Sequence, residues 1–454
     1  MTQIQTRTAP SSSASETRRE DARPARSLAR WLARVLLGAV LLSPLPSAAQ
    51  TSPDKDAPLP GRVVIDVDSP ERALYRIAVP NLQGPAAPAA EGGEVLRTDL
   101  KLSSLFQVLD PRSFLANLEA EGLTIQKAPW SSVGAQGIIK GQLTQNGSAI
   151  VIDMRLFELA HGEAPVFSKT YKGDIKQLRP FMHDFANEVL RVLTGKSGAF
   201  GTRLTYARKV GPGRKDIYVA DFDGHNEFRA SSGRGNAMLP SFGQNGGVWY
   251  SKLTEMGSFI TNTKSREQPV IRGNGLNIGP VICEGRVFFS SSRDGNSEIY
   301  SAALDGSDVR RLTRDPGIDV SPACGPGGKI AFVSSRHGGP QIFSMNGDGS
   351  GVQRISYKGS HNQTPAYCMD PGNPLIAFSA RDGGGFDIVT INLKTGEYKR
   401  LTQGQGVNQD PTFSPDCRMV AFASSRGGVF ISNPDGLNQI KVLNGAISTV
   451  RWSR

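Results

Sequence analysis

The C-terminal half of the chain repeats a short pattern, and this repeat restricts the possible folds more than any other feature. An apolar run ending in Ser or Ala and then Arg occurs at Val287–Gly295, Ile330–Arg336, Ile376–Gly383 and Val420–Arg426, and two weaker copies lie around Tyr206 and Tyr250. The aromatic anchors of the copies are Tyr206, Tyr250, Phe289, Phe332, Phe378 and Phe422, spaced 44, 39, 43, 46 and 44 residues apart. A period of about 40–45 residues with four short strands per unit is typical of a β-propeller. Six units therefore predict six blades.

Each unit divides into four expected strands, A to D, of which A contains proline and B is the apolar run. The array begins with a B strand at Leu204–Tyr206 and ends at Thr449–Ser453, which has the A pattern of Pro411–Ser414. This phase predicts that residues 204–454 form a six-bladed all-β propeller closed by the C-terminal strand. Closure removes the free strand edges on which another chain could pair.

Residues 61–195 have a mixed pattern that predicts a small N-terminal α/β domain, joined to the propeller by a linker at residues 196–203. Strands are expected at 62–67, 75–79, 106–110, 137–143, 149–156 and 167–171, and a helix at 94–105. Asn146-Gly147 is a strong hairpin signal between two of these strands. Asp174 and Gly195 are expected to cap a second helix whose apolar face recurs at helical spacing.

The first 49 residues have the pattern of a secretory signal peptide. Four arginines between Arg23 and Arg34 precede an apolar run at Val35–Leu42, and small residues follow up to Ala49. We expect cleavage after Ala49, with an uncleaved membrane anchor as the alternative. Residues 50–60 are polar and contain proline, which predicts a mobile segment.

Charge and cysteine content exclude some classes of function and leave others open. The chain carries a net charge of +11, and removal of residues 1–49 leaves about +7 without a basic stripe, so nucleic-acid binding is not expected. An exported chain with four cysteines can form disulfides. Because the cysteines fall in the A strands and A–B turns of successive units, pairs Cys283–Cys324 and Cys368–Cys417 would tie neighbouring blades, with four separate buried thiols as the alternative.

No catalytic, metal or cofactor site is predicted. Gly195-Lys196-Ser197 lacks the earlier glycine of a phosphate-binding loop, and its spacing does not match a nucleophile elbow. The five histidines are scattered without ligand spacing. We therefore expect a binding protein rather than an enzyme.

Strand geometry places the B–C and D–A loops at one end of an antiparallel propeller. The arginines that follow the B strands, Arg293, Arg336, Arg381 and Arg426, then share this end with the polar residues that precede the A strands. An arginine-rich rim suits an acidic, hydrogen-bonding protein surface. The alternative is that these arginines satisfy loop backbone and nearby carboxylates such as Asp294 and Asp382.

The linking stretch Thr194–Tyr206 and the segment Val219–Asn226 resemble the TolB family, the periplasmic propeller component of the Tol–Pal system. The resemblance covers nearly the whole expected mature chain. It implies a monomeric periplasmic adaptor that binds the lipoprotein Pal and the membrane-anchored protein TolA, with other outer-membrane proteins as further partners. It also implies a role in outer-membrane integrity and in constriction during cell division. Combined with strand geometry, it predicts a Pal-binding face that contains Asn277, Arg293, Arg336, His361, Asn362, Gln363, Arg381 and Asn408.

The same resemblance implies that TolA binds a short segment made of Arg62, Val63, Val64, Ile65 and Asp66. A β-branched stretch of this kind can add to the edge of a partner's sheet, with an ordinary internal strand as the alternative. About a dozen residues precede the segment after the expected cleavage site, whereas it lies close to the mature N-terminus in the family. The second blade also departs from the family, because Gln244-Asn245-Gly246 replaces its Ser-Pro-Asp-Gly turn.

Two other classes of function remain as alternatives. One is a propeller enzyme. A peptidase of this kind would need an added hydrolase domain, and a sugar lyase would need clustered histidine ligands. A glycan-binding propeller would place exposed aromatic side chains at the mouth of the ring, where this chain has mainly Arg, Asn and Asp.

Overall fold

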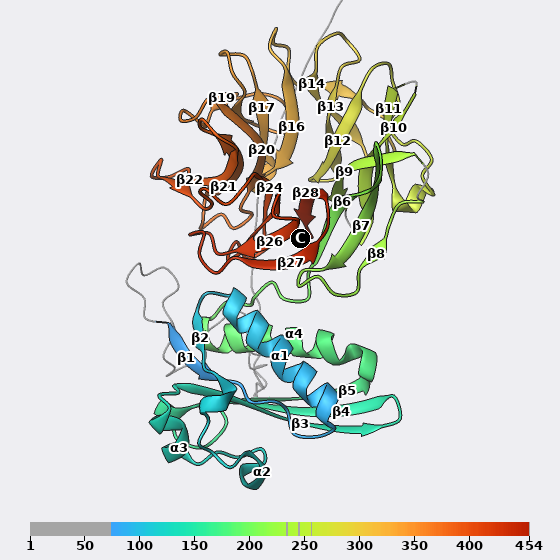
Figure 1. Ribbon diagram of the computed structural model, residues 1–454. Coiled ribbons are helices and arrows are strands. Elements are labelled where there is room, and N and C mark those ends of the chain that lie inside the picture. The colour runs from blue at the N-terminus through green and yellow to red at the C-terminus, as the bar shows by residue number, and fades with distance from the viewer. Residues whose placement is uncertain (1–73, 233–234, 244–245, 256, 454) are drawn as a thin grey trace, which may run out of the picture. The chain divides into compact units, whose positions relative to one another are not determined.

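The computed structural model of the chain describes residues 74–453 except 233–234, 244–245 and 256. The described residues contain an α/β region followed by the propeller (Figure 1). The expected signal peptide, the segment at 50–60 and the strand at 62–67 lie outside the described residues. No helix among the described residues combines the length and the apolar character needed to cross a membrane.

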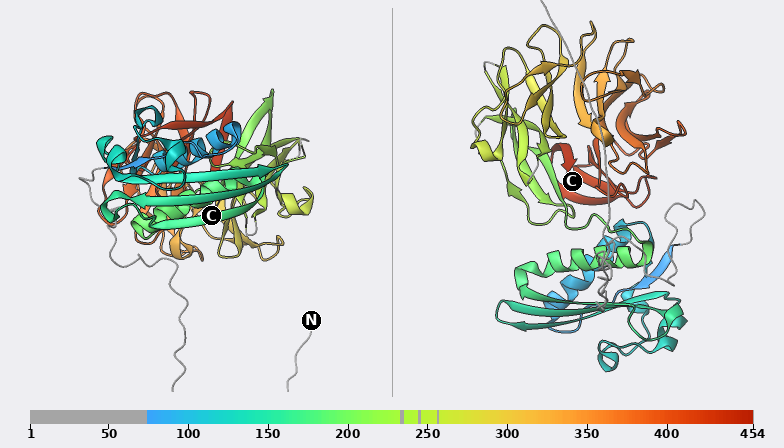
Figure 2. Two further views of the ribbon diagram at one scale, coloured as in Figure 1. Left: turned by 90° about the horizontal axis from the view of Figure 1, so that it is seen from below. Right: turned by 180° about the vertical axis from the view of Figure 1, so that it is seen from behind.

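The α/β region is one sheet with helices on both faces. Its elements are β1 (Tyr75–Ala78), α1 (Ala86–Leu102), β2 (Phe106–Val108), α2 (Leu118–Glu121), α3 (Lys127–Ser132), β3 (Gly137–Asn146), β4 (Ala149–Glu158), β5 (Phe167–Asp174) and α4 (Leu178–Thr194). The strand order is β2-β1-β3-β4-β5, in which β1 runs parallel to its two neighbours and β3 to β5 are antiparallel. Helices α1 and α4 lie side by side on one face (Figure 2).

The ends of α4 follow from local chemistry. Asp174 accepts a hydrogen bond from the Lys176 amide and forms a capping box with Gln177 before a short 3₁₀ turn leads into the helix. Gly195 ends the helix with φ of +75°, a left-handed conformation that glycine adopts without steric cost. The buried face of α4 is apolar at helical spacing, which fixes the helix on the sheet.

The first helix begins earlier than its sequence pattern predicts. We expected residues 94–105, but α1 starts at Ala86 and ends at Leu102. Its first turns contain small residues and two glycines, which give no apolar periodicity. Gly92 packs closely there, because a Cβ at this position would lie 2.2 Å from the end of the Leu82 side chain, which would have to move. Close packing of α1 thus removes the signal by which the helix could have been recognised.

The propeller consists of six antiparallel sheets arranged around an axis (Figure 1). Blade 1 is β28 (Ile447–Trp452), β6 (Arg203–Gly211), β7 (Arg214–Asp221) and β8 (Phe228–Arg229), and blade 2 is β9 (Asn236–Phe242), β10 (Val248–Thr254) and β11 (Gly257–Asn262). Blade 3 is β12 (Asn277–Cys283), β13 (Arg286–Ser291), β14 (Glu298–Ala303) and β15 (Arg310–Arg311), and blade 4 is β16 (Asp319–Cys324), β17 (Ile330–Ser334), β18 (Gln341–Met345) and β19 (Gln353–Arg354). Blade 5 is β20 (His361–Tyr367), β21 (Leu375–Arg381), β22 (Phe386–Asn392) and β23 (Tyr398–Arg400), and blade 6 is β24 (Asn408–Phe413), β25 (Val420–Ser424), β26 (Gly428–Ser432) and β27 (Ile440–Asn444).

The six-bladed fold class predicted from the repeat is confirmed. The six aromatic anchors that defined the repeat are all completely buried. Each sits on a B strand and packs between blades, which explains why an aromatic side chain recurs there. In blade 2 the described residues form only three strands, and an isolated bridge between Ile260 and Ile271 takes the place of the fourth.

The C-terminal strand β28 is the A strand of blade 1. It pairs antiparallel with β6, with Trp452 opposite Leu204. The Trp452 ring stacks on Phe222 at a centroid distance of 6.3 Å, and its indole N–H donates to Thr202 Oγ1 at 2.6 Å. The beginning and the end of the propeller are therefore joined in one sheet.

Every A strand carries a β-bulge where it passes the axis. The register shifts in all six A–B pairs, and the bulged residue has a positive φ between +52° and +67° in each case. The bulged residues are Leu239, Gly279, Ser321, Thr364, Asp410 and Thr449. All six line one small cavity of about 60 Å³. The bulges thus turn the inner strands so that the axis is narrowly packed.

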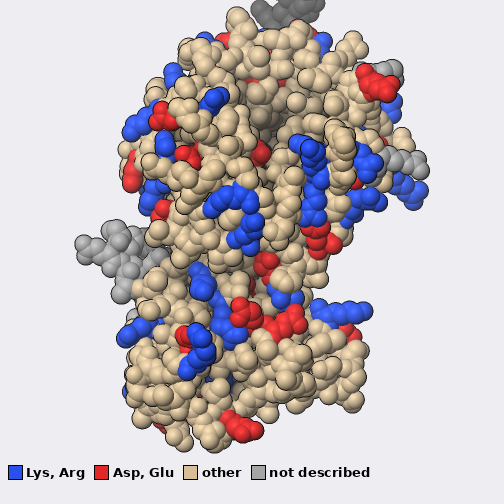
Figure 3. Space-filling view, viewed as in Figure 1, with Lys and Arg blue, Asp and Glu red and all other residues tan. Residues whose placement is uncertain are grey.

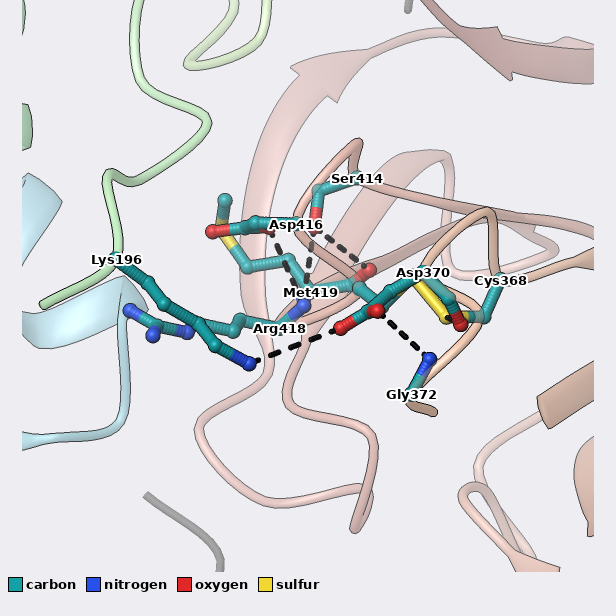
Figure 4. Close-up of a disulfide and its surroundings, with 9 residues drawn as sticks. Lys196, Cys368, Asp370, Gly372, Ser414, Asp416, Arg418 and Met419 are labelled. Carbon is teal, nitrogen blue, oxygen red and sulfur yellow. Dashed lines mark hydrogen bonds and ion pairs between the residues drawn. A yellow bond between two sulfur atoms is a disulfide. The ribbon is translucent and has the colours of Figure 1, made fainter. Parts of the chain in front are cut away.

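The structure contains two disulfides between blades. Cys283 is joined to Cys324, and Cys368 to Cys417, so that blades 3 and 4 and blades 5 and 6 are covalently tied. Figure 4 shows the second disulfide, with Lys196 of the linker reaching towards Asp370 at 4.0 Å. This ion pair is exposed and therefore contributes little to stability.

Candidate functional site

The B–C and D–A loops lie at one end of the propeller, here called the loop face. In blade 4 an arginine side chain at this face packs over aromatic rings of its own blade. Arg336 Nε donates to Ser334 Oγ at 2.8 Å, and Nη2 donates to Asp319 Oδ2 at 2.8 Å. Its guanidinium lies 5.5 Å from the Phe332 centroid and 5.1 Å from that of Phe343. Burial raises the pKa of Asp319, although the nearby Arg336 opposes this shift.

Blade 3 repeats this arrangement, which we call the arginine clamp. Arg293 Nε donates to Ser291 Oγ at 3.0 Å, and Nη2 donates to Asn277 Oδ1 at 2.7 Å. The guanidinium lies 5.5 and 5.1 Å from the Phe289 and Tyr300 centroids. The spacing Phe-x-Ser-Ser-Arg produces the clamp, because it places the arginine over the aromatic ring of the residue four positions earlier.

Blade 6 has the same clamp with one added partner. Arg426 Nε donates to Ser424 Oγ at 3.0 Å, and Nη2 approaches Gln439 Oε1 at 3.0 Å and Asn408 Oδ1 at 3.5 Å. Its guanidinium lies 3.8 Å from the Phe430 centroid, and burial lowers its pKa. Three of the four arginines therefore bond local groups, which is the kind of role that the alternative interpretation gave them. The carboxylates it named are not their partners, because Asp294 pairs with Arg311 and Asp382 with Arg400.

Arg381 of blade 5 differs from the other three. Its B strand is one residue shorter between the aromatic anchor and the arginine, so Arg381 stays within β21 and pairs with Phe386. Its side chain is exposed, and Nε donates only to the Gly384 carbonyl at 3.2 Å among the described residues. Arg381 is thus the most exposed arginine of the four, whereas Arg293, Arg336 and Arg426 are half-buried.

The asparagines predicted for the binding face are internal. Asn277, Asn362 and Asn408 are completely buried and bond to neighbouring loops and strands. They cannot contact a partner while the blades are intact, so their role at the face is to hold the D–A loops in place. The sequence could not distinguish an outward from an inward asparagine at the first position of a strand.

His361 and Gln363 are half-buried and remain accessible. His361 Nε2 lies 3.2 Å from Gln363 Oε1, and its ring packs edge-on against Phe386 at 5.2 Å. Together with Arg381, which pairs with His361 across the strands, they form a continuous polar patch on blade 5.

Sequence reasoning missed a set of aliphatic residues on the same face. Leu276, Ile318 and Val407 are exposed by 42%, 53% and 38%, and each directly precedes an A strand. Their signal was the recurring pair of an aliphatic residue followed by Asn or Asp. Exposed apolar side chains among clamped arginines are the composition expected for the core and rim of a protein interface.

Surface charge does not form a single stripe on the visible face. Figure 3 shows Lys and Arg scattered among Asp and Glu across it. Among the described residues, no three His, Cys, Asp or Glu side chains are grouped so that they could hold a metal ion. The predicted TolA-binding segment, Arg62 to Asp66, lies outside the described residues.

Family models match both parts of the chain. A model described as the TolB beta propeller domain matches residues 190–454, which is more than half of the chain. A second model, described as the TolB amino-terminal domain, matches residues 63–164.

Curated relatives agree with these matches. The Tol-Pal system protein TolB of Anaeromyxobacter dehalogenans strain 2CP-C is 35% identical over 275 residues, which cover 58% of this chain and 62% of that protein. The chain thus spans about three fifths of the length of the first curated relatives it matches. The protein of the same name from Myxococcus xanthus is 34% identical over 387 residues, which cover 80% of this chain and 84% of the relative.

A solved structure supports the fold. The crystal structure of TolB from Acinetobacter baumannii superposes with a TM-score of 0.73 at 23% identity, over 84% of this chain and 96% of that one. At this identity the likeness concerns the fold alone. From the two family models and the relatives together, the chain belongs to the TolB family.

Proposed function

We propose that this chain is a periplasmic adaptor of the Tol–Pal system that binds the lipoprotein Pal through the loop face of its propeller. In this role it supports outer-membrane integrity and constriction during cell division, and it performs no covalent chemistry. Relatives named Tol-Pal system protein TolB support the assignment to that system.

The observation that carries the proposal is the composition of the loop face. Ile318, Leu276 and Val407 offer separate apolar anchors, and the blade-5 patch of Arg381, His361 and Gln363 offers polar contacts beside them. Clamped arginines hold the loops, so little conformational entropy is lost when a partner binds. A preorganised surface of this kind suits recognition of a folded protein.

The test is a binding titration of the mature protein with the soluble domain of Pal from the same organism. Ile318→Asp should weaken binding by about 30-fold or more, because a central apolar anchor typically contributes about 2 kcal/mol. Leu437→Asp is the matched control, since Leu437 is 64% exposed in a C–D turn at the opposite end of the propeller. Equal affinities for the two variants would contradict the proposed location of the binding face.

We further propose that residues 62–66 bind TolA by adding a strand to its sheet. The β-branched Val63-Val64-Ile65 run supports this mode. Replacing Val64 with Pro should abolish binding to the isolated TolA domain while Pal binding persists. Retained TolA binding would show that another segment is responsible.

A further inference from the structure

Two cavities follow one another along the axis of the propeller. The first, of about 60 Å³, lies at the level of the six β-bulges. The second, which we call the axial cavity, has a volume of about 80 Å³ and lies further along the A strands, towards the A–B turns. Its wall includes the residue two positions after each bulge, where pairing with the B strand resumes. These six residues form the axial ring, and they are Ser241, Val281, Ala323, Ala366, Thr412 and Arg451.

The axial ring contains a single charge. Arg451 is its one charged member, and no other charged residue is found among the described residues that line the axial cavity. The other five members are small or aliphatic, so they leave space beside the long side chain of Arg451. Arg451 is half-buried and lines both cavities. The axial cavity is therefore a confined space with one positive charge in its wall.

The guanidinium of Arg451 has no carboxylate partner among the described residues. Its Nη1 donates to the Val450 carbonyl at 2.8 Å, which is its one side-chain hydrogen bond to a described residue. Burial lowers the pKa of Arg451, although Asp410 opposes this shift. Because arginine keeps its charge in proteins, partial desolvation without a counter-ion is costly, and an anion beside it would remove part of that cost.

Asp410 does not neutralise the axial cavity, because it lies at a different level of the axis. It occupies the bulge of blade 6 and lines the first cavity but not the axial cavity. Its Oδ2 accepts a hydrogen bond from the Thr449 amide at 2.9 Å, which holds the carboxylate at the bulge level. An anion that enters from the A–B turns would meet Arg451 before it meets Asp410.

Two hydroxyl groups in the wall of the axial cavity have a proton to donate. Thr412 Oγ1 accepts from the Trp452 amide at 3.2 Å, and Ser453 Oγ accepts from the Arg203 amide at 2.9 Å. Neither hydroxyl donates to a described residue, so each proton can turn to a ligand in the cavity. Much of the remaining wall is apolar. Such a wall suits a weakly hydrated monovalent anion better than phosphate or sulfate, whose higher charge is more costly to desolvate.

We propose that the axial cavity binds one monovalent inorganic anion of the halide class, such as chloride, against the guanidinium of Arg451. The hydroxyls of Thr412 and Ser453 donate to the same anion. The cavity is far smaller than those that hold drug-sized ligands, which leaves room for an ion and little else. Because Arg451 lies on the closing strand β28 and Thr412 on blade 6, the site is complete only in the closed ring. The inference does not depend on which partner binds the loop face.

Bromide is the probe in a crystal, because it carries the charge of chloride and scatters X-rays anomalously. Crystals of the mature, disulfide-bonded protein soaked in sodium bromide should show an anomalous peak in the axial cavity, in contact with the Arg451 guanidinium. Absence of a peak there would overturn the proposal. This measurement uses the wild-type protein and needs no variant to fold.

Chloride is the probe in solution, where binding broadens the ³⁵Cl NMR line. The wild-type protein should broaden the line, and added bromide should reverse the broadening. Arg451→Gln should reduce the broadening by about tenfold or more, since hydrogen bonds to a charged group are lost, whereas Arg451→Lys should retain part of it. Arg214→Gln is the matched control and should behave as the wild type, because Arg214 loses the same charge at the exposed β6–β7 turn. Equal broadening by the two Gln variants would overturn the proposal, and so would a bromide peak in the crystal without broadening in solution, which would mean binding at crystal concentration only.

Stability gives a linked measurement, because an anion that binds only the closed ring stabilises it. At constant ionic strength, replacing gluconate, which is too large for the cavity, with chloride should raise the Tm of the wild type and of Arg214→Gln but not that of Arg451→Gln. An equal rise in both variants would show a general salt effect and overturn the proposal. If Arg451→Gln does not fold, the bromide map and the Arg451→Lys variant decide the outcome.

Discussion

A buried histidine between two carboxylates should make the stability of this protein depend on pH in the alkaline range. His183 on α4 lies with Nδ1 2.7 Å from Asp99 Oδ2 and Nε2 3.5 Å from Asp223 Oδ2. The side chains of all three are at most 5% exposed. Burial alone would lower the pKa of His183, but Asp99 and Asp223 outweigh this and raise it to about 9.

The sign of the effect follows from this direction. Because the folded pKa of His183 is above the unfolded value near 6.5, the charged histidine stabilises the fold fully below pH 6.5. That stabilisation is lost as the pH rises through about 9. The difference between the two pKa values corresponds to about 3 kcal/mol, as an order of magnitude. Burial raises the pKa of Asp99 to about 6, so below that pH the cluster also gains a proton there.

His183→Gln is the matched perturbation, since glutamine keeps a hydrogen-bond donor but carries no charge. Urea unfolding of the two proteins should differ by about 3 kcal/mol more at pH 6.5 than at pH 10. The comparison cancels other groups that titrate in this range, including lysines and tyrosines. An NMR titration of the His183 Cε1 proton gives its pKa directly. A midpoint near 6.5, or a difference between the proteins that does not change with pH, would refute the reasoning.

Three further predictions concern what holds the propeller together. Replacing both Cys368 and Cys417 with Ser should lower the free energy of unfolding by up to about 4 kcal/mol, the loop-closure value for a separation of 49 residues, which denaturant titration under oxidising conditions would measure. Trp452→Ala should destabilise the fold by about 3–5 kcal/mol through loss of a buried ring, seen as a lowered Tm, whereas Trp452→Phe should recover most of this. Gly224→Ala should greatly reduce the yield of folded protein, because its Cβ would lie 1.9 Å from a backbone oxygen of β27. Gly213→Ala, where the added Cβ meets open space, should lower the free energy of unfolding by only about 1 kcal/mol. Similar losses for the two variants would show that the positive φ, and not the steric contact, determines the effect.

The propeller could be predicted because its anchors repeat. An aromatic residue recurs where each B strand packs against the neighbouring blade, and complete burial of Phe289 and Phe332 shows why the position tolerates little else. The helix α1 was placed too late, because close packing at Gly92 removed its periodicity. Residue types alone were therefore enough to predict the fold only where their pattern repeated along the chain.

The loop face was harder to predict, because the contacts made there depend on the direction in which each side chain points. The Ser-Arg pair recurs in the sequence, but only the structure shows that Arg293 and Arg336 fold back onto aromatic rings. The missing residue before Arg381 is visible in the sequence. Its consequence, that Arg381 stays within β21 and is exposed instead of lying over an aromatic ring, required the three-dimensional arrangement.

The pairing of β28 with β6 has a consequence for the order of events during synthesis. A chain made from its N-terminus presents β6 long before β28, since 250 residues separate Arg203 from Ser453. Until the last strand arrives, blade 1 has an unpaired inner edge on which other chains could assemble. The α/β region can form early from local contacts, but the ring stays open to aggregation or chaperone binding until synthesis is complete.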